Sequence, residues 1–412
     1  MKKRKNIVFY FEDKQGFGHA CGFKSLFDAL SKDFNILLFF SWNNRRHHFL
    51  QWVKTVFLPF HEGYNKKLKE QKCKLIREFL YDFNPDIFFM DYYPFWKYQL
   101  RHEMREIIGA TKKNNGKVYT FMRDIYIWEQ WMSKNDYEYH KISLEKEFWR
   151  SITEQLELSG DEVLRKIIHN LDGQVFRVNL FFEHYLSHGL IDKVLMFGDE
   201  NIHKIENELH LPWDLKKKFH YLGYICPEIG VRYKKTRKKT NKIIVSSWWN
   251  ITSEKQFLQL LLNLNKLKGY QVDVFLWDFI REDYKNFIIQ YFESSNTIQI
   301  WWFVTDFREK LIEYDFYFGF GGYGTFLDLL YDGIPSFIFP NFDNKIFADR
   351  KLEQENRIKL LEWKVNMFPL EKFSVEYIQQ LLNTEYENIS WDIHLAQDSD
   401  IISLLQTLKI DD

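Results

Sequence analysis

Four glycines lie within six positions of one segment, residues 318–340, which reads FGFGGYGTFLDLLYDGIPSFIFP. They form a turn that leads into a predicted amphipathic helix, and this helix ends at Gly333 before a new apolar strand. Glycine lets the backbone approach a phosphate closely, and the N–H groups at the start of a helix favour negative charge. An ordinary strand, turn and glycine-capped helix would explain only the second half of the segment. The glycine density therefore favours a phosphate-binding turn.

A second glycine turn, QGFGHACG at residues 15–22, follows the first apolar run of the chain. Gly16 and Gly18 bracket the turn, and His19 is expected at the carboxyl end of the preceding strand. An imidazole titrates near neutral pH, so it suits a general base that takes a proton from an incoming hydroxyl group. A helix-capping or structural histidine is the alternative. The position of His19 after a first strand favours the general base.

The composition sets limits on the class of protein. A length of 412 residues predicts two or three domains, and a net charge of +0 gives no electrostatic reason to expect nucleic acid. The three cysteines are far apart with no CxxC spacing, which argues against a zinc site or a disulfide framework and favours the cytoplasm. Tryptophan is abundant, and some of the 14 indoles are expected to line a sugar or apolar ligand surface.

Short apolar runs alternate with helical stretches along the chain, a pattern typical of doubly wound parallel sheets. The first series has predicted strands at residues 7–11, 35–41, 86–90, 117–122 and 193–197, with helices at 23–31 and 66–83. The second series has predicted strands at 243–247, 271–276, 297–301, 316–318 and 336–339, with helices at 253–266, 281–292 and 326–331. Two α/β units of this kind predict a ligand cleft between them, at the carboxyl ends of both sets of strands.

A basic run, YKKTRKKTNK at residues 233–242, separates the two series. We interpret it as a solvated linker, because it stands alone and a nucleic-acid patch would need more basic surface. The predicted division is a first unit at 1–230 with an excursion near 137–179, a basic linker at 231–242, and a second unit at 243–412. The last helix of the second unit is expected to return to the first.

Several motifs in this order resemble nucleotide-sugar glycosyltransferases of the GT-B architecture, which has two Rossmann-like domains facing a central cleft. They are the GFGH turn, Thr325 and Asp328 three positions apart, and the closing DGIPSFIFP strand, together with DYYPFW at 91–96, MRDI at 122–125, and MFGDENIH and HYLGYICP within 196–227. The chain is most similar to the predicted glycosyltransferases related to the peptidoglycan N-acetylglucosaminyltransferase. The resemblance implies an acceptor-side first domain and a donor-binding second domain.

With this resemblance we predict an inverting, metal-independent transferase that moves a sugar from a nucleoside-diphosphate donor, uridine by default, to a hydroxyl acceptor. The resemblance implies that His19 is the base, that Gly16, Gly18 and Asp91 lie on the acceptor side, that Gly321, Gly322, Gly324 and Thr325 face the diphosphate, and that Asp328 binds the ribose hydroxyls. No cofactor or metal is expected, because a helix N-terminus would carry the charge of the diphosphate.

Two segments depart from the pattern of the family. Ser246, Ser247 and the Trp248–Trp249 pair replace a glycine-rich loop after the first strand of the second unit. The two hydroxyl groups are still expected to meet phosphate oxygens, but the two indoles limit close backbone approach. Past Pro340 the chain reads NFDNKIFADR, so Asn344 is assigned to the donor site while the donor sugar cannot be carried over.

Two other functions remain open. A nucleotide-sugar epimerase or hydrolase would use the same two domains, with Asp13, Asp91 and Asp124 as extra carboxylates if they converge on His19. A non-catalytic sugar-binding descendant of a transferase is the second alternative, and the Trp248–Trp249 departure supports it.

The acceptor is undetermined, with a lipid-linked or a glycan hydroxyl as the alternatives. Residues 42–60 combine aromatic side chains with Arg45 and Arg46, a mixture that suits peripheral contact with the inner face of a membrane. A buried helix followed by a solvated loop is the alternative for this segment.

Overall fold

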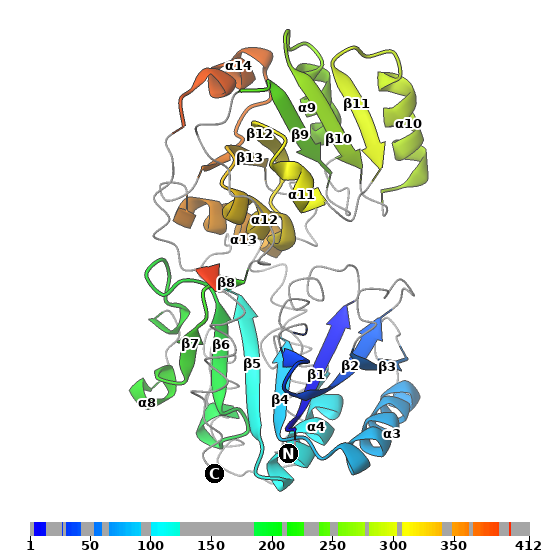
Figure 1. The fold of residues 1–412 in the computed structure, drawn as a ribbon, viewed down its shortest axis with the longest axis vertical. Helices are drawn as coiled ribbons and strands as arrows, with labels where there is room; N and C mark the ends of the chain where they lie inside the picture. Colours follow the sequence, from blue (N-terminus) through cyan, green and yellow to red (C-terminus); the bar gives the residue numbers. More distant parts are fainter. Residues whose placement is uncertain are drawn as a thin grey trace, which may run out of the picture. The chain divides into compact units, whose positions relative to one another are not determined.

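The chain forms two compact units, each built on a parallel sheet (Figure 1). The computed structural model describes residues 4–13, 27, 30–42, 53–59, 66–91, 100–123, 185–207, 212–225, 239–247, 254–276, 280–302, 307–339, 348–361, 366–386 and 395–396. Described residues up to Ile225 belong to the first unit, and those from Lys239 to Leu395 belong to the second. The two Rossmann-like units predicted from the sequence are confirmed.

The first unit contains a seven-stranded sheet with the order β3-β2-β1-β4-β5-β6-β7, in which every pairing is parallel. Its strands are β1 (Asn6–Asp13), β2 (Asn35–Trp42), β3 (Lys54–Leu58), β4 (Ile87–Asp91), β5 (Lys117–Arg123), β6 (Lys193–Phe197) and β7 (Phe219–Tyr221). A separate two-stranded sheet pairs β8 (Tyr224–Ile225) with β15 (Leu395–Ala396).

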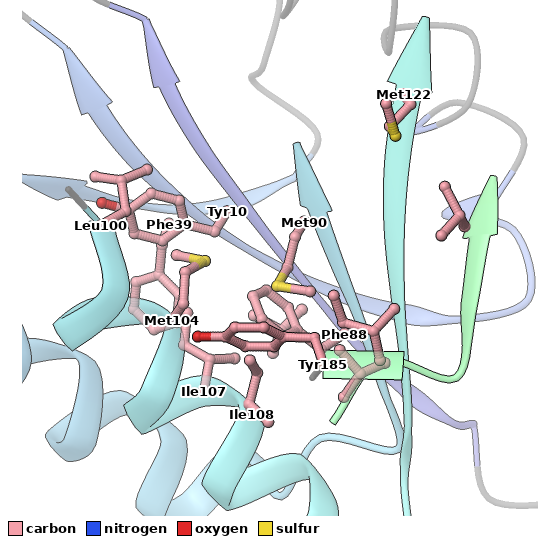
Figure 2. Close-up of a cluster of buried hydrophobic side chains, with 14 of the residues drawn as sticks. Tyr10, Phe39, Phe88, Met90, Leu100, Met104, Ile107, Ile108, Met122 and Tyr185 are labelled. Carbon is pink, nitrogen blue, oxygen red and sulfur yellow. The ribbon is translucent and has the colours of Figure 1, made fainter. Parts of the chain in front are cut away.

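Both faces of the first sheet are apolar, which is why its strands are nearly continuous hydrophobic runs. Along β1, Val8 and Tyr10 face one buried cluster, while Ile7, Phe9 and Phe11 face another. The helices α3 (Lys66–Phe83) and α4 (Arg101–Lys113) pack on the first of these faces. Figure 2 shows that face, where side chains of α4 meet those of the central strands.

The second unit contains a six-stranded parallel sheet with the order β11-β10-β9-β12-β13-β14. Its strands are β9 (Lys242–Ser246), β10 (Gln271–Leu276), β11 (Ile298–Trp302), β12 (Phe316–Phe320), β13 (Ser336–Phe339) and β14 (Met367–Pro369). Its helices are α9 (Glu254–Leu264), α10 (Glu282–Phe292), α11 (Phe307–Leu311), α12 (Tyr323–Asp332), α13 (Ala348–Leu361) and α14 (Val375–Asn383). The first unit also holds the short helices η4 (Ile205–Asn207) and α8 (Trp213–Lys216).

The strand order reverses direction once in each sheet. In the first sheet the chain runs outward from β1 to β3 and then continues on the other side with β4. In the second sheet it runs from β9 to β11 and then continues on the other side with β12. Ligands of open α/β sheets bind beside the carboxyl ends of the strands at such a reversal. We therefore expect ligand sites at the carboxyl ends of β1 and β4 in the first unit, and of β9 and β12 in the second.

Two expectations need correction. For the segment 42–60, the alternative of a buried helix is wrong in the described residues 53–59, where β3 forms the edge of the first sheet with Val56 and Leu58 buried and Phe57 half exposed. Helix α12 begins at Tyr323 and not at residue 326, so Gly324 and Thr325 belong to its first turn and Asp328 to its second. The turn at 15–20, the excursion at 137–179 and the basic linker up to residue 238 lie outside the described residues. No helix among the described residues is long and apolar enough to cross a bilayer.

Candidate functional site

The start of α12 lies directly after β12, at the reversal point of the second sheet. Gly322 is the N-cap residue, and its carbonyl oxygen accepts the first helical hydrogen bond from the Phe326 N–H at 2.7 Å. No side chain in the described part of the chain caps this terminus, and no acidic residue lies in the first turn. The first N–H groups of a helix have no partner within the helix, and they carry its positive dipole end. This helix terminus is suited to an anion such as a phosphate group.

The other end of α12 explains one glycine without any ligand. Gly333 has a φ of 72° in the left-handed region, and its N–H donates to the Leu329 carbonyl oxygen at 2.9 Å. This is a glycine C-cap, a conformation that other residues adopt at a cost. The second half of the glycine-rich segment is therefore explained by helix capping alone, as expected from the sequence for an ordinary glycine-capped helix.

Two glycines before α12 are required by the packing of neighbouring atoms, and not by a ligand. A Cβ atom at Gly319 would lie 2.5 Å from the Tyr317 hydroxyl oxygen and 2.6 Å from the Ser246 carbonyl oxygen. A Cβ atom at Gly321 would lie 2.7 Å from Cγ2 of Ile338. Both positions therefore need glycine for packing, whether or not a phosphate binds.

Gly324 is different, because a Cβ atom there would meet nothing within 4 Å. It is exposed, and it occupies the first turn of a helix, where glycine is less favourable than alanine by about 0.5–1 kcal/mol. Packing among the described residues gives no reason for glycine at this position. The open space above Gly324 leaves the helix N-terminus accessible to a ligand.

Ser246 and Tyr317 form a hydrogen-bonded pair beside this turn. The Tyr317 hydroxyl donates to the Phe320 carbonyl oxygen at 3.0 Å, and the Ser246 hydroxyl lies 2.7 Å from the Tyr317 hydroxyl. Because the single proton of Tyr317 is used on Phe320, Ser246 donates its own proton to Tyr317. In this arrangement the Ser246 hydroxyl has no proton left for a phosphate oxygen. The neighbouring Ser247 is buried, and its N–H donates to the Phe275 carbonyl oxygen at 3.2 Å.

Asp328 lies one helical turn after Gly324, on the same face of α12. Its side chain is half-buried, whereas its neighbours Leu327 and Leu329 are buried. Burial raises the pKa of Tyr317, the hydrogen bond with Ser246 lowers it, and the negative charge of Asp328 raises it further. The charge of Asp328 therefore acts on the Tyr317 hydroxyl, which is hydrogen-bonded to the Phe320 carbonyl oxygen at the end of β12.

Two exposed tryptophans end the edge strand β11 at the same carboxyl edge. Trp301 is 41% exposed, and its indole Nε1 donates to Asp273 Oδ1 at 3.0 Å, while the Tyr314 hydroxyl donates to Asp273 Oδ2 at 2.8 Å. Trp302 is 53% exposed, and the Lys285 ammonium lies 3.6 Å from the centroid of its ring. Three strand spacings, about 14 Å, separate β11 from β12. That distance is comparable to the length of an extended nucleoside diphosphate.

Tyr317 and Trp302 were not among the site residues predicted from the sequence. Tyr317 gave no signal, because an aromatic residue inside an apolar strand is ordinary in sequence. Trp302 could have been found from the sequence, because it immediately follows a predicted strand. The abundance of tryptophan already suggested that some indoles line a ligand surface. The position of β11 in the sheet, which no local pattern reveals, was the missing information.

In the first unit, Asp91 is the last residue of β4 and is 3% exposed. β4 pairs with β1, so Asp91 lies at the strand-order reversal of this sheet. Gly16, Gly18 and His19 follow β1 but lie outside the described residues, as do Trp248, Trp249 and Asn344 of the second unit. Their assignments stay predictions. Among the described residues, no three His, Cys, Asp or Glu side chains group as a metal site would require.

Neither a protein-family model nor a curated protein matches the chain by sequence. Solved structures resemble it in fold. A UDP-glucosyltransferase from Polygonum tinctorium is 11% identical with a TM-score of 0.53, and the alignment covers 99% of this chain and 94% of that one. The glycotransferase of kitacinnamycin is 10% identical with a TM-score of 0.53, covering 99% and 94% of the two chains.

A nucleotide-sugar enzyme of another class is similar to the same degree. The UDP-GlcNAc 2-epimerase from Methanocaldococcus jannaschii is 8% identical with a TM-score of 0.54, covering 98% of this chain and 99% of that one. At such identities the likeness concerns the fold. The chain therefore has the GT-B architecture of two Rossmann-like units, as the sequence resemblance implied.

Proposed function

We propose that the protein is an inverting, metal-independent glycosyltransferase that uses a nucleoside-diphosphate sugar, with uridine as the expected nucleoside. The observation that carries this proposal is the uncapped N-terminus of α12, left open by a glycine that packing does not require. A diphosphate placed there would meet free N–H groups and the positive end of the helix dipole. The fold likeness to enzymes of UDP-sugars supports the same assignment.

In this proposal, the remaining donor contacts come from residues at the carboxyl edge of the second sheet. With the diphosphate at Gly322 and Gly324, Asp328 is placed one turn further along the helix, where a carboxylate can accept two ribose hydroxyls. The nucleobase would extend toward β11 and stack on the exposed face of Trp302, a contact typically worth about 1–3 kcal/mol. Thr325 in the first turn would add a hydroxyl near the phosphates. In this proposal Ser246 supports the turn through Tyr317 and does not bind phosphate.

The chemical step needs a base and a stabilised leaving group. His19 would take the proton of the acceptor hydroxyl while its oxygen attacks the anomeric carbon, and the bond from that carbon to the diphosphate would break in the same step. A single displacement of this kind inverts the anomeric centre. The negative charge gained by the departing diphosphate would be held at the start of α12 without any metal. Asp91 would orient the imidazole, because β1 and β4 end side by side.

Gly324 allows a sharp test of donor binding. Gly324→Glu adds a carboxylate where a Cβ meets no other atom, so we expect the fold to persist and uridine diphosphate to bind at least tenfold more weakly, because of charge repulsion. Gly109 in α4 is the matched control, since a Cβ there also meets nothing within 4 Å. Calorimetry showing equal affinity for Gly324→Glu, Gly109→Glu and wild type would place the donor elsewhere.

The alternative functions differ in the products that they form from a UDP-sugar and in whether they need an acceptor. An epimerase or hydrolase would convert a UDP-sugar without any acceptor, and the likeness to a UDP-GlcNAc 2-epimerase keeps this function in view. A non-catalytic descendant would bind uridine diphosphate and convert no donor. Chromatography of products from a panel of UDP-sugars, with and without hydroxyl acceptors and with a chelator present, separates these outcomes. Transfer that requires a hydroxyl acceptor and survives the chelator supports the proposal.

A further inference from the structure

The amino edge of the first sheet carries a local concentration of lysines. These lysines lie at the end of α4, at the starts of β5 and β6, and between α8 and β7: Lys112, Lys113, Lys117, Lys193, Lys216, Lys217 and Lys218. The strands β5, β6 and β7 are neighbours, so their starting residues lie together. The whole chain has a net charge of +0, and this basic amino edge is therefore a local feature.

Two lysines of the basic amino edge, Lys117 and Lys193, lie close enough for their charges to interact. Burial and the charge of Lys117 lower the pKa of Lys193, and the charge of Lys193 adds to burial in lowering the pKa of His220. One carboxylate of this edge, Asp192, is already bound to Lys112 with an N–O distance of 2.6 Å. Asp214 lies in the same segments as these lysines, and Asp86, whose carbonyl oxygen accepts the Lys117 N–H at 2.9 Å, is another carboxylate of this edge. The edge therefore keeps a positive excess that could meet an anionic surface.

An exposed tryptophan stands on the same edge. Trp213 is 72% exposed and begins α8, which lies beside β7 in Figure 1. Leu215 of the same turn is buried in the core, so the turn is anchored and its indole is held on the solvent side. The Lys217 ammonium lies 5.5 Å from the centroid of the Trp213 ring. An indole beside lysines is typical of the boundary between membrane and water.

We propose that the basic amino edge docks the first unit on an anionic bilayer surface, with Trp213 in the headgroup region and the lysines against lipid phosphates. Lysines near such a surface attract anionic lipids, and an exposed indole adds interfacial affinity. An acidic protein would satisfy the lysines but gives no reason for an exposed indole. This docking surface differs from residues 42–60 and does not depend on the transferase proposal. The carboxyl ends of the strands of this sheet, including the end of β4 where Asp91 lies, are at its opposite edge.

Vesicle co-sedimentation at low salt tests the proposal. We expect wild type to bind vesicles of phosphatidylcholine with phosphatidylserine, to bind pure phosphatidylcholine vesicles much less, and to dissociate as salt is added. Lys216→Gln combined with Lys217→Gln should lower the partition coefficient about thirtyfold, as expected for two surface lysines. Trp213→Ala should lower it on anionic vesicles as well.

The helix α3, which lies far from α8 and β7 within the first unit (Figure 1), supplies matched controls. Tyr81→Ala removes a side chain that is 83% exposed, and Lys67→Gln with Lys74→Gln removes two exposed lysines. These variants should sediment like wild type. Equal losses in the control and test variants would overturn the proposal, and so would a wild type that ignores anionic vesicles. A wild type that binds a polyglutamate peptide and no vesicle would assign the edge to an acidic protein instead.

Discussion

The hydroxyl oxygens of Ser246 and Tyr317 lie 2.7 Å apart, although the two residues are 71 positions apart in the chain. They come from β9 and β12, the neighbouring strands between which the strand order of the second sheet reverses. Tyr317 passes the hydrogen bond on to the Phe320 carbonyl oxygen, just before the glycine turn. This short chain of hydrogen bonds fixes the backbone that leads into α12.

Removing the Tyr317 hydroxyl should destabilise the second unit. Tyr317→Phe leaves the buried Phe320 carbonyl and the Ser246 hydroxyl without this partner, so we expect a loss of about 1–3 kcal/mol in the free energy of unfolding. Tyr386→Phe is the matched control, because that hydroxyl donates to the Leu381 carbonyl from a partly buried site. Urea denaturation should show the larger loss for Tyr317→Phe. A loss no greater than that of the control would mean that the pair contributes little.

Two glycine-to-alanine substitutions should have opposite effects on stability. Gly319→Ala places a methyl group against the Tyr317 hydroxyl and the Ser246 carbonyl, so the second unit should lose stability. Gly109→Ala fills open space in α4 and should add about 0.5–1 kcal/mol, because alanine favours a helix. Thermal unfolding monitored by circular dichroism measures both. Equal shifts of the melting temperature would contradict the packing explanation for Gly319.

Asp328 should select for ribose. Asp328→Asn is expected to weaken binding of nucleoside diphosphates by about 1–3 kcal/mol, the usual cost of a hydrogen bond to a charged group, while inorganic pyrophosphate keeps its affinity. Gly322→Val should weaken both ligands alike, because a branched side chain at the N-cap blocks the approach of phosphate. Competition calorimetry distinguishes the two patterns. An Asp328→Asn variant that loses pyrophosphate as strongly as uridine diphosphate would assign the carboxylate to the phosphates or to the fold.

His19 and Asp91 should affect turnover and not donor affinity. His19→Ala is expected to abolish transfer, while the dissociation constant for uridine diphosphate stays near that of wild type. Asp91→Asn should reduce transfer to a lesser degree, because it would act through the orientation of the imidazole. Initial rates and calorimetry on the same preparations provide both measurements. A His19→Ala variant that transfers sugar at the wild-type rate would remove the base from the mechanism.

Cys73 should remain protonated in the folded protein at mildly alkaline pH. Burial raises the pKa of its thiol to about 12, and Glu103 and Glu106 add to the increase. The unfolded thiol ionises near pH 9 and the folded one does not, so this group lowers stability as the pH rises from about 9 to about 12. In a chain whose other cysteines are replaced by alanine, we expect slow alkylation at pH 8.5 that accelerates in denaturant. Fast alkylation of the native chain would contradict the burial of Cys73.

Local sequence patterns predicted most of the central strands of both units. The bounds of α3, β6, β10 and β13 agree with the structure, because each is a sharply bounded apolar or amphipathic run. The edge strand β3 was missed, since only its alternate residues are buried and Lys54 and Phe57 look like loop or surface residues. The start of α12 was placed too late for a related reason. Gly324 disfavours a helix, and the tertiary position of the turn overrides that preference.

The candidate site was only partly predictable. The sequence indicated the glycine turn and Asp328, which are close in the chain and follow one helical pattern. It assigned Ser246 to phosphate because a hydroxyl after a strand is a natural donor, and the partner that uses its proton is Tyr317, on a strand far away in sequence. The reasons for Gly319 and Gly321 likewise depend on atoms of other strands. Pairings across a sheet are long-range, so periodicity along one segment cannot reveal them.

The reversal of strand order in the second sheet also sets when the site can exist. β9 and β12 are neighbours in the sheet although β10 and β11 separate them in the chain, so the turn before α12 depends on a distant pairing. Closing such a distant pairing costs entropy early and yields its contacts late, which places it among the slow steps of folding. A nucleotide that binds this edge would therefore stabilise the unit as a whole.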